Sequence, residues 1–187
     1  MRHGPSGRTG SWWQAVAASR SAMSFRDEIL AANARFASRL PTLDRVARPS
    51  RAIAVLACMD ARLRPEEALG LELGEAHVVR NAGGRASDDA IRSLALSSHV
   101  LGTRSFAVIH HTDCGLLGTT NDELHARIAE TTGADVRAID FLPFDDAEQA
   151  LAEDVERIRT SAFIDDEIEV LGLRYDVRTG VIDVVVP

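Results

Sequence analysis

Apolar and polar positions follow two rhythms along the chain, one typical of strands and one typical of helices. Short apolar runs have the length of buried parallel strands, at residues 51–60, 76–80 and 105–110. Helical spacing or helix start and stop signals lie between and after them, at residues 64–71, 87–102, 121–132 and 145–159. Strands alternating with helices predict an α/β fold with a mainly parallel β-sheet flanked by helices.

Both ends of the chain add elements to this plan. Residues 24–40 show helical spacing that begins at Ser24 and stops before a proline. Residues 168–186 alternate between apolar and polar positions, with Thr179–Gly180 as a turn, so they predict a C-terminal strand and hairpin. We therefore expect one α/β domain over residues 23–187, with a helical arm at its N-terminal end.

The first 22 residues differ in composition from the rest. They are rich in Gly and Ser and lack the continuous apolar core of a signal peptide. We expect residues 1–22 to be a disordered leader. Trp12–Trp13 could dock on a partner chain, or belong to a loose tail. Without an export signal, the expected location is the cytoplasm.

The net charge of the chain limits the kinds of molecule that it is expected to bind. The 187-residue chain has a net charge of −7, and all 21 of its basic residues are Arg. An acidic chain without a basic block is a poor candidate for binding nucleic acid or an anionic membrane. Its apolar stretches are also shorter than the roughly 20 residues that a membrane-spanning helix needs. We expect neither a nucleic-acid partner nor a membrane partner.

Two cysteines and a histidine stand where chemistry is expected. Cys58 ends the first predicted strand, and His111 and Cys114 follow the third. Because parallel strands end at one edge of a sheet, these three side chains can meet there. Two thiolates and one imidazole suit Zn²⁺, and the sequence has no third Cys to close a structural site. This pattern predicts one zinc with an open coordination position; the alternative is a buried thiol pair without metal.

Asp60 and Arg62 lie two and four positions after the first cysteine. If the chain stays extended there, Cys58, Asp60 and Arg62 project to one side. The carboxylate could accept a hydrogen bond from water on the metal or bind the metal itself, while the guanidinium keeps it ionised. The alternative is an ordinary surface ion pair. For Asp113, between two of the expected ligands, a turn-forming side chain is a sufficient explanation.

Two segments together resemble a known family. Residues 58–62 (CMDAR) and 111–115 (HTDCG) are similar to the paired Cys-x-Asp-x-Arg and His-x-x-Cys motifs of β-carbonic anhydrases. Residues 79–84 (VRNAGG) resemble the segment beside the active site in that family, and residues 170–180 resemble its closing strand and turn. The likeness extends from residue 24 to the C-terminus.

The resemblance implies an enzyme that reversibly hydrates CO2 to bicarbonate and a proton, by attack of a hydroxide that zinc activates. It implies Cys58, His111 and Cys114 as zinc ligands, with Asp60 and Arg62 as the catalytic pair. It also implies a homodimer, or a tetramer of paired dimers, in which the N-terminal helix packs across the partner subunit.

Three further expectations remain open at this point. The backbone of Ala82, Gly83 and Gly84 either lines the substrate pocket, because Gly lets the main chain approach a small ligand, or is merely a turn. The same metal centre could instead hydrolyse another small linear substrate, such as carbonyl sulfide or carbon disulfide. A non-enzymatic zinc or thiol protein is a third possibility, which the presence of both Asp60 and Arg62 disfavours.

Overall fold

The computed structural model describes residues 24–40 and 46–187. The chain forms two units, Met1–Asp44 and Arg45–Pro187. Helix α2 (Phe25–Ala37) belongs to the first unit and begins as predicted, with the Ser24 side chain accepting a hydrogen bond from the Asp27 amide. The expectations for residues 1–22, including Trp12–Trp13, lie outside the described residues.

The second unit is built on a five-stranded sheet, which confirms the predicted fold class. Its strands follow the order β2-β1-β3-β4-β5; the first four are parallel, and the last pairs antiparallel with β4. The strands are β1 (Ile53–Cys58), β2 (Ala76–Asn81), β3 (Ser105–His111), β4 (Glu169–Tyr175) and β5 (Ile182–Val186). The antiparallel pair β4–β5 is the hairpin that the alternating tail predicts.

Helices join the strands, and local capping explains where most of them begin. They are α3 (Pro65–Ala68), the short 3₁₀ turn η1 (Ala82–Gly84), α4 (Asp88–His99), α5 (Asn121–Thr132) and α6 (Ala147–Arg159). The side chains of Ser87, Thr120 and Asp146 cap the three longer helices by accepting hydrogen bonds from first-turn amides. Gly133, in the left-handed conformation, ends α5 at the predicted place.

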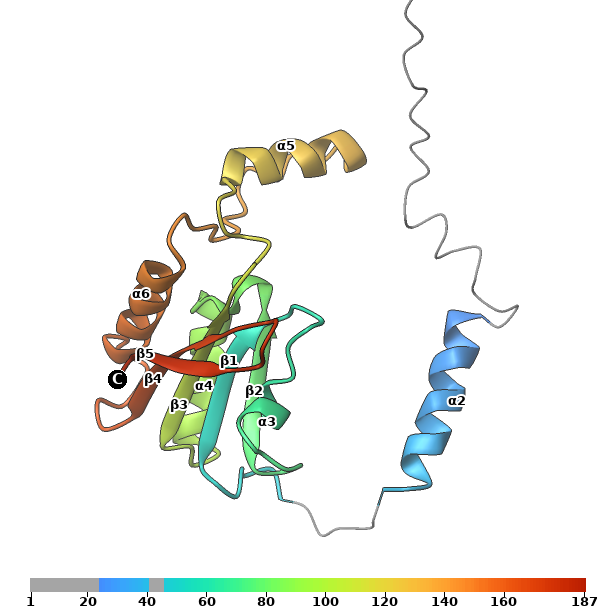
Figure 1. The fold of residues 1–187 in the computed structure, drawn as a ribbon, viewed down its shortest axis with the longest axis vertical. Coiled ribbons are helices and arrows are strands. Elements are labelled where there is room, and N and C mark those ends of the chain that lie inside the picture. The colour runs from blue at the N-terminus through green and yellow to red at the C-terminus, as the bar shows by residue number, and fades with distance from the viewer. Residues whose placement is uncertain (1–23, 41–45) are drawn as a thin grey trace, which may run out of the picture. The chain divides into compact units, whose positions relative to one another are not determined.

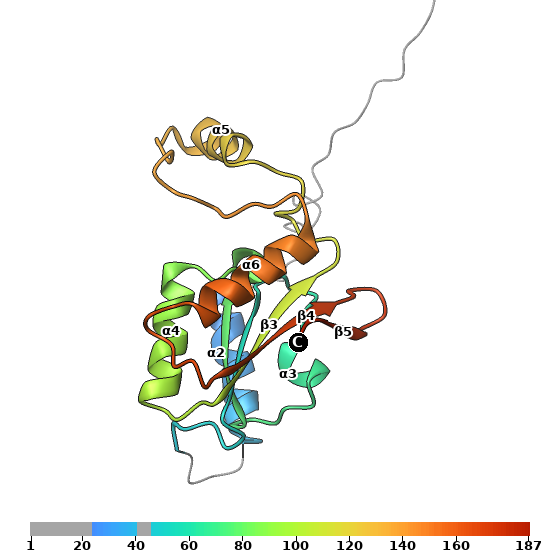
Figure 2. The same ribbon diagram turned by 90° about the vertical axis from the view of Figure 1, so that its left-hand side faces the viewer.

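The two faces of the sheet are covered differently. Helices α4 and α6 lie against one face, and α3 lies on the other side (Figure 2). Between the sheet and α4 and α6 lies an apolar core whose members include Leu56, Ile91, Leu94, Phe106, Val108, Leu151 and Val155. Helix α5 has no buried residue and projects away from the sheet (Figure 1). No helix in the described ranges has the length and apolar character needed to cross a bilayer.

The strand order brings the expected metal ligands together. Strands β1 and β3 are parallel neighbours, with Ala57 opposite Ile109 in their register. Cys58 and His111 therefore both lie where these central strands end, at the carboxyl edge at which open α/β sheets place their sites.

Candidate metal centre

Cys58, His111 and Cys114 form a compact group at this edge. Their ligand atoms, two sulfurs and an imidazole nitrogen, lie within 4.8 Å of one another, and all three residues are buried. The two thiols are free. A turn after β3, in which Asp113 adopts a positive φ of 57°, carries the chain from His111 to Cys114. The structure thus brings together the three residues expected to bind metal.

The His111 ring is oriented for metal binding. Its Nδ1 lies 2.9 Å from the Thr112 carbonyl oxygen. Because a carbonyl can only accept, the neutral ring carries its proton on Nδ1 and leaves the Nε2 lone pair free. That Nε2 atom is buried and has no hydrogen-bond partner among the described residues. A buried polar atom without a partner is costly, and a metal ion would satisfy it.

The two neighbouring thiols shift each other's pKa in opposite directions. The effect of Cys114, helped by His111 and against the effect of burial, lowers the pKa of Cys58 to about 4. The effect of Cys58, together with burial, raises the pKa of Cys114. Near neutral pH the pair therefore carries one negative charge before any metal binds. Soft sulfur donors, that charge and an imidazole nitrogen together fit Zn²⁺.

Asp60 and Arg62 pair closely beside this group. Arg62 Nε donates to Asp60 Oδ1 at 2.9 Å, and Arg62 Nη2 donates to Oδ2 at 2.7 Å. Asp60 Oδ2 lies 3.9 Å from His111 Nε2. These bonds from Arg62 hold the pKa of Asp60 well below its usual range, against a smaller effect of burial, and Asp60 raises the pKa of Arg62 in return. The carboxylate is thus ionised and held beside the candidate ligands.

The chain does not stay extended after Cys58, so the condition under which Cys58, Asp60 and Arg62 project to one side is not met. Strand β1 ends at Cys58, and a turn follows in which the Leu63 amide donates to the Asp60 carbonyl oxygen at 3.1 Å. The Arg62 amide also donates to Asp60 Oδ1 at 2.9 Å. An Asp side chain readily bonds the backbone two residues on and so favours a turn over an extended strand. The two side chains therefore meet through this turn.

Two other residues contact this loop, and neither contact was expected from the sequence. Arg80, at the end of β2, donates from Nε to the Cys58 carbonyl oxygen at 2.9 Å and from Nη2 to the Asp60 carbonyl oxygen at 2.6 Å. Asp113 accepts from Arg62 Nη1 at 2.7 Å. The one available signal was position: Arg80 lies in the segment that resembles the family, directly before Asn81.

The segment Ala82–Gly84 packs directly on the metal-ligand strands. Gly83 and Gly84 have φ of 78° and 70°, the left-handed region that favours glycine. A Cβ at Gly84 would lie 2.9 Å from the backbone nitrogen of Cys58. The Gly83 backbone also helps to lower the pKa of the Cys58 thiol. The segment therefore packs against β1 at Cys58, and its role as a substrate pocket remains a prediction.

A buried polar cluster lies behind the site. Asp154 of α6 accepts from the Ala86 amide at 2.9 Å and contacts His110 Nε2 at 3.0 Å. Arg85 Nε lies 2.8 Å from the same carboxylate, an ion-pair distance, although its N–H does not point at the oxygen as a hydrogen bond requires. His110 points away from the candidate metal ligands, as expected from strand alternation. Asp154 thus ties the loop after η1 and the end of β3 to a helix.

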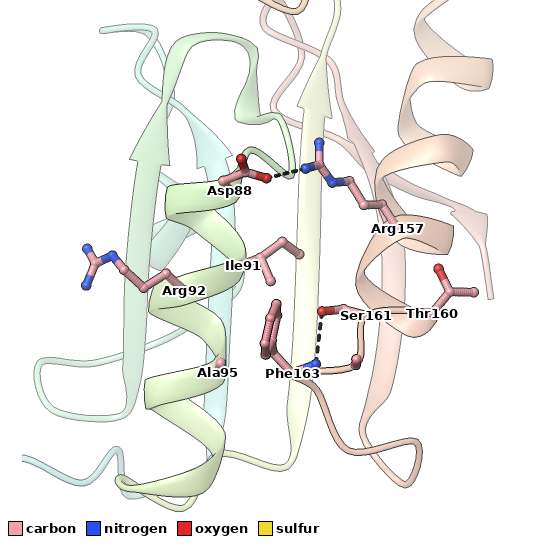
Figure 3. Close-up of a pocket in the computed structure, with 9 residues that line it drawn as sticks. Asp88, Ile91, Arg92, Ala95, Arg157, Thr160, Ser161 and Phe163 are labelled. Carbon is pink, nitrogen blue, oxygen red and sulfur yellow. Dashed lines mark hydrogen bonds and ion pairs between the residues drawn. The ribbon is translucent and has the colours of Figure 1, made fainter.

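Of the cavities on the described surface, one lies near the candidate metal ligands and a larger one lies away from them. A cavity of about 270 Å³ lies beside the cluster and is lined in part by His110 and His111. A larger one, of about 590 Å³, lies between α4 and the segment after α6, where Ile91 and Phe163 face it and Arg157 pairs with Asp88 (Figure 3). None of the described residues that line this larger cavity is Cys or His. Size therefore does not identify the reactive site; donor chemistry does.

Comparisons with known proteins agree with this placement. The family model described as Carbonic anhydrase matches residues 53–182. Beta-carbonic anhydrase 1 of Mycobacterium tuberculosis is 40% identical over 171 residues, which cover 88% of this chain and 100% of that protein. The crystal structure of a carbonic anhydrase from Streptococcus mutans superposes with a TM-score of 0.84 at 41% identity, covering 88% of this chain and 99% of that one. A carbon disulfide hydrolase of Acidithiobacillus thiooxidans is 32% identical, covering 70% of this chain and 75% of that protein.

Proposed function

This chain belongs to the carbonic anhydrase family, in its β class, and on that premise we propose that Cys58, His111 and Cys114 hold the zinc with which it reversibly hydrates CO2. The observation that carries the proposal is the buried group of two sulfurs and the unpartnered His111 Nε2, within 4.8 Å of one another. Bound there, zinc would lower the pKa of a water molecule from about 16 towards about 7 and so supply the nucleophile near neutral pH.

Asp60 acts in this reaction as an acceptor. It is ionised, so it accepts a hydrogen bond from the attacking water and directs the oxygen lone pair towards the carbon of CO2. Arg62 occupies both carboxylate oxygens, at 2.9 and 2.7 Å. The guanidinium would thereby keep Asp60 from binding a metal held by Cys58, His111 and Cys114, and would leave room there for water. Because the pKa of Asp60 is held so low, the proton that the reaction releases passes to solvent or buffer rather than to this carboxylate.

The backbone and apolar side chains complete the site. The Ala82–Gly84 backbone packs against β1 at Cys58 and so lies beside the reaction. Leu63 is buried against the two cysteines, and Leu116 and Val177 pack around them. These apolar contacts exclude water from one side of the centre and suit a small substrate without charge.

Charge at the centre predicts how activity depends on pH. Cys58 and Cys114, as thiolates, offset the charge of a divalent cation, whereas three neutral imidazoles would not. Water beside them is therefore harder to ionise, and we expect CO2 hydration to become faster towards alkaline pH.

Stopped-flow CO2 hydration from pH 6.5 to 9, on protein of measured zinc content, tests the function. We expect turnover that scales with zinc content, rises with pH and drops in the variant Asp60→Asn. A protein with one zinc per chain and no turnover at any of these pH values would refute the proposal.

A comparison of substrates separates carbonic anhydrase from the alternative activity. Carbonyl sulfide and carbon disulfide are linear like CO2, and several relatives are named carbon disulfide hydrolase. Coverage favours the carbonic anhydrase relatives, one of which is 40% identical over 88% of this chain. We therefore expect turnover of CO2 to exceed that of either sulfur compound when all three are offered to the same protein.

We also propose that the enzyme works as a homodimer that could pair into a tetramer. Helix α2 has no buried residue, and its Ile29, Leu30 and Phe36 are exposed. Strand β2 forms one edge of the sheet, with side chains that are mostly only half-buried. Light scattering coupled to size exclusion would give the mass, and Phe36→Glu should weaken association if α2 lies in the interface.

The two ligand thiols also bear on where the enzyme works. Both must stay reduced to bind zinc, and they lie close enough to be vulnerable to oxidation. A reducing compartment, the cytoplasm, suits them. Fractionation of cells that produce the protein would test this location.

A further inference from the structure

Arg62 is shared between two carboxylates. One edge of its guanidinium, Nε and Nη2, faces Asp60. The other edge faces Asp113: Nη1 donates to the Asp113 carboxylate at 2.7 Å, and Nη2 donates to the Asp113 carbonyl oxygen at 2.9 Å. The contact joins residues 51 positions apart in the chain. Both edges of the Arg62 guanidinium are therefore hydrogen-bonded, each to a different loop.

The turn at Asp113 does not by itself require an aspartate. Its φ of 57° is tolerated best by Gly and Asn, and a local turn would employ the side chain on nearby backbone. The carboxylate oxygen instead meets the Arg62 guanidinium. The turn that the sequence predicts here therefore accounts for the backbone conformation of Asp113. It does not account for the direction of the Asp113 side chain.

We propose that Asp113 is a positioning residue, which fixes Arg62 from the second loop and through it sets the direction of the Asp60 carboxylate. This rests on the proposed function, in which Asp60 orients the attacking water. Asp60 and Arg62 follow β1, whereas Asp113 lies between the two candidate ligands that follow β3. The Asp60–Arg62–Asp113 chain therefore joins the two ligand-bearing loops without using the metal.

Geometry favours an effect on orientation over an effect on stability. The Asp113 side chain is 75% exposed and that of Arg62 is 44% exposed. Exposed ion pairs contribute little to the free energy of unfolding, so the loss of Asp113 should leave the fold intact. A guanidinium held along one edge only can tilt together with Asp60, however, and small misplacements of a catalytic group are costly in rate.

Two substitutions at position 113 and one elsewhere test the inference. Asp113→Gly keeps the positive φ and the backbone carbonyl contact but removes the carboxylate, and Asp113→Asn keeps an acceptor oxygen without the charge. Asp135→Asn is the matched control, because Asp135 forms a similar exposed pair with Arg137, at 2.7 Å, on the segment after α5. Each protein is assayed for zinc content, kcat and KM for CO2, and the NMR signal of the Arg62 Nε–H.

The expected result is a loss of roughly tenfold in kcat with KM little changed for Asp113→Gly, and a smaller loss for Asp113→Asn. Zinc content stays at that of the wild type, the Arg62 Nε–H signal broadens or exchanges faster, and Asp135→Asn matches the wild type. In an Arg62→Gln background, Asp113→Gly costs nothing further, because its effect passes through Arg62.

Three results would overturn the inference: unchanged kcat in Asp113→Gly, an equal loss in the Arg62→Gln background, or a loss that only follows missing zinc. A wild-type protein that carries zinc and does not hydrate CO2 would refute the proposed function instead. The Arg62 Nε–H signal would still decide whether Asp113 holds Arg62.

Discussion

Replacing Gly84 by alanine tests how tightly the candidate pocket segment is packed on the metal-ligand strands. A Cβ at this position would lie 2.9 Å from the Cys58 nitrogen, 2.9 Å from the Ile109 carbonyl oxygen and 3.1 Å from the Ala57 carbonyl carbon. All three are backbone atoms of β1 and β3, which pair with each other in the centre of the sheet. They cannot move aside without breaking that pairing.

The size of the effect follows from two costs. The φ of Gly84 is 70°, and placing a residue with a Cβ in that region costs about 1–2 kcal/mol. Forcing a methyl group into a packed interior adds about 1–3 kcal/mol. We therefore expect the free energy of unfolding to fall by about 2–5 kcal/mol, a large part of the 5–15 kcal/mol that is typical of a domain. If the segment moves away instead, its packing against Cys58 is lost and the affinity for zinc falls.

Urea denaturation followed by circular dichroism, with and without zinc, measures both effects. Gly102→Ala is the matched control: its φ is 77°, but the nearest atom to an added Cβ, Arg48 Nη1, is 4.0 Å away. The control carries only the backbone cost, so Gly84→Ala should be the more destabilised by at least about 1 kcal/mol. Equal losses in the two variants, with equal zinc affinity, would refute the argument from close packing.

Three more predictions concern buried charge and metal. In metal-free protein, absorbance near 240 nm should show one thiolate that persists down to about pH 4, because the pKa of Cys58 is about 4 and that of Cys114 is raised; two thiols titrating together near about pH 8.5 would contradict this. Asp154→Asn leaves the buried Arg85 without its carboxylate and should cost about 3–5 kcal/mol of unfolding free energy, measured in urea; a change within error would show that this charge needs no compensation. Chelation of zinc should lower the melting temperature, since free zinc at about a thousand times its Kd stabilises the fold by about 4 kcal/mol; identical melts with zinc and with chelator would count against a bound metal.

Local signals in the sequence were sufficient to predict the helices and strands and to point to the candidate metal site. Ser87 and Gly133 mark a helix start and a helix end because their effects involve only neighbouring residues, and the structure has both where expected. The apolar runs predict the central strands for a similar reason. A strand that is buried on both faces of the sheet has apolar residues at successive positions instead of alternating with polar ones. The motif around Cys58 and the one around His111 then predicted the three candidate ligands, which the structure brings together because parallel strands end at one edge.

The conformation of residues 58–62 does not follow from strand alternation, because neighbouring residues compete for the same backbone. Alternation would place Cys58, Asp60 and Arg62 on one side only of an extended chain. The Asp60 side chain instead bonds the Arg62 amide and turns the chain. The ion pair was foreseen, but its geometry depended on which local preference prevailed.

Contacts over long sequence separations were decided by the tertiary structure alone. Asp113 reaches Arg62 across 51 positions, and Asp154 reaches His110 across 44. Neither pairing follows from composition or periodicity, because the first requires two loops to meet and the second requires α6 to pack over the end of β3. The sequence determines which side chains are present and what chemistry they can perform. Which partner an Asp or Arg contacts depends on the order in which the strands pair and on the helix that covers them.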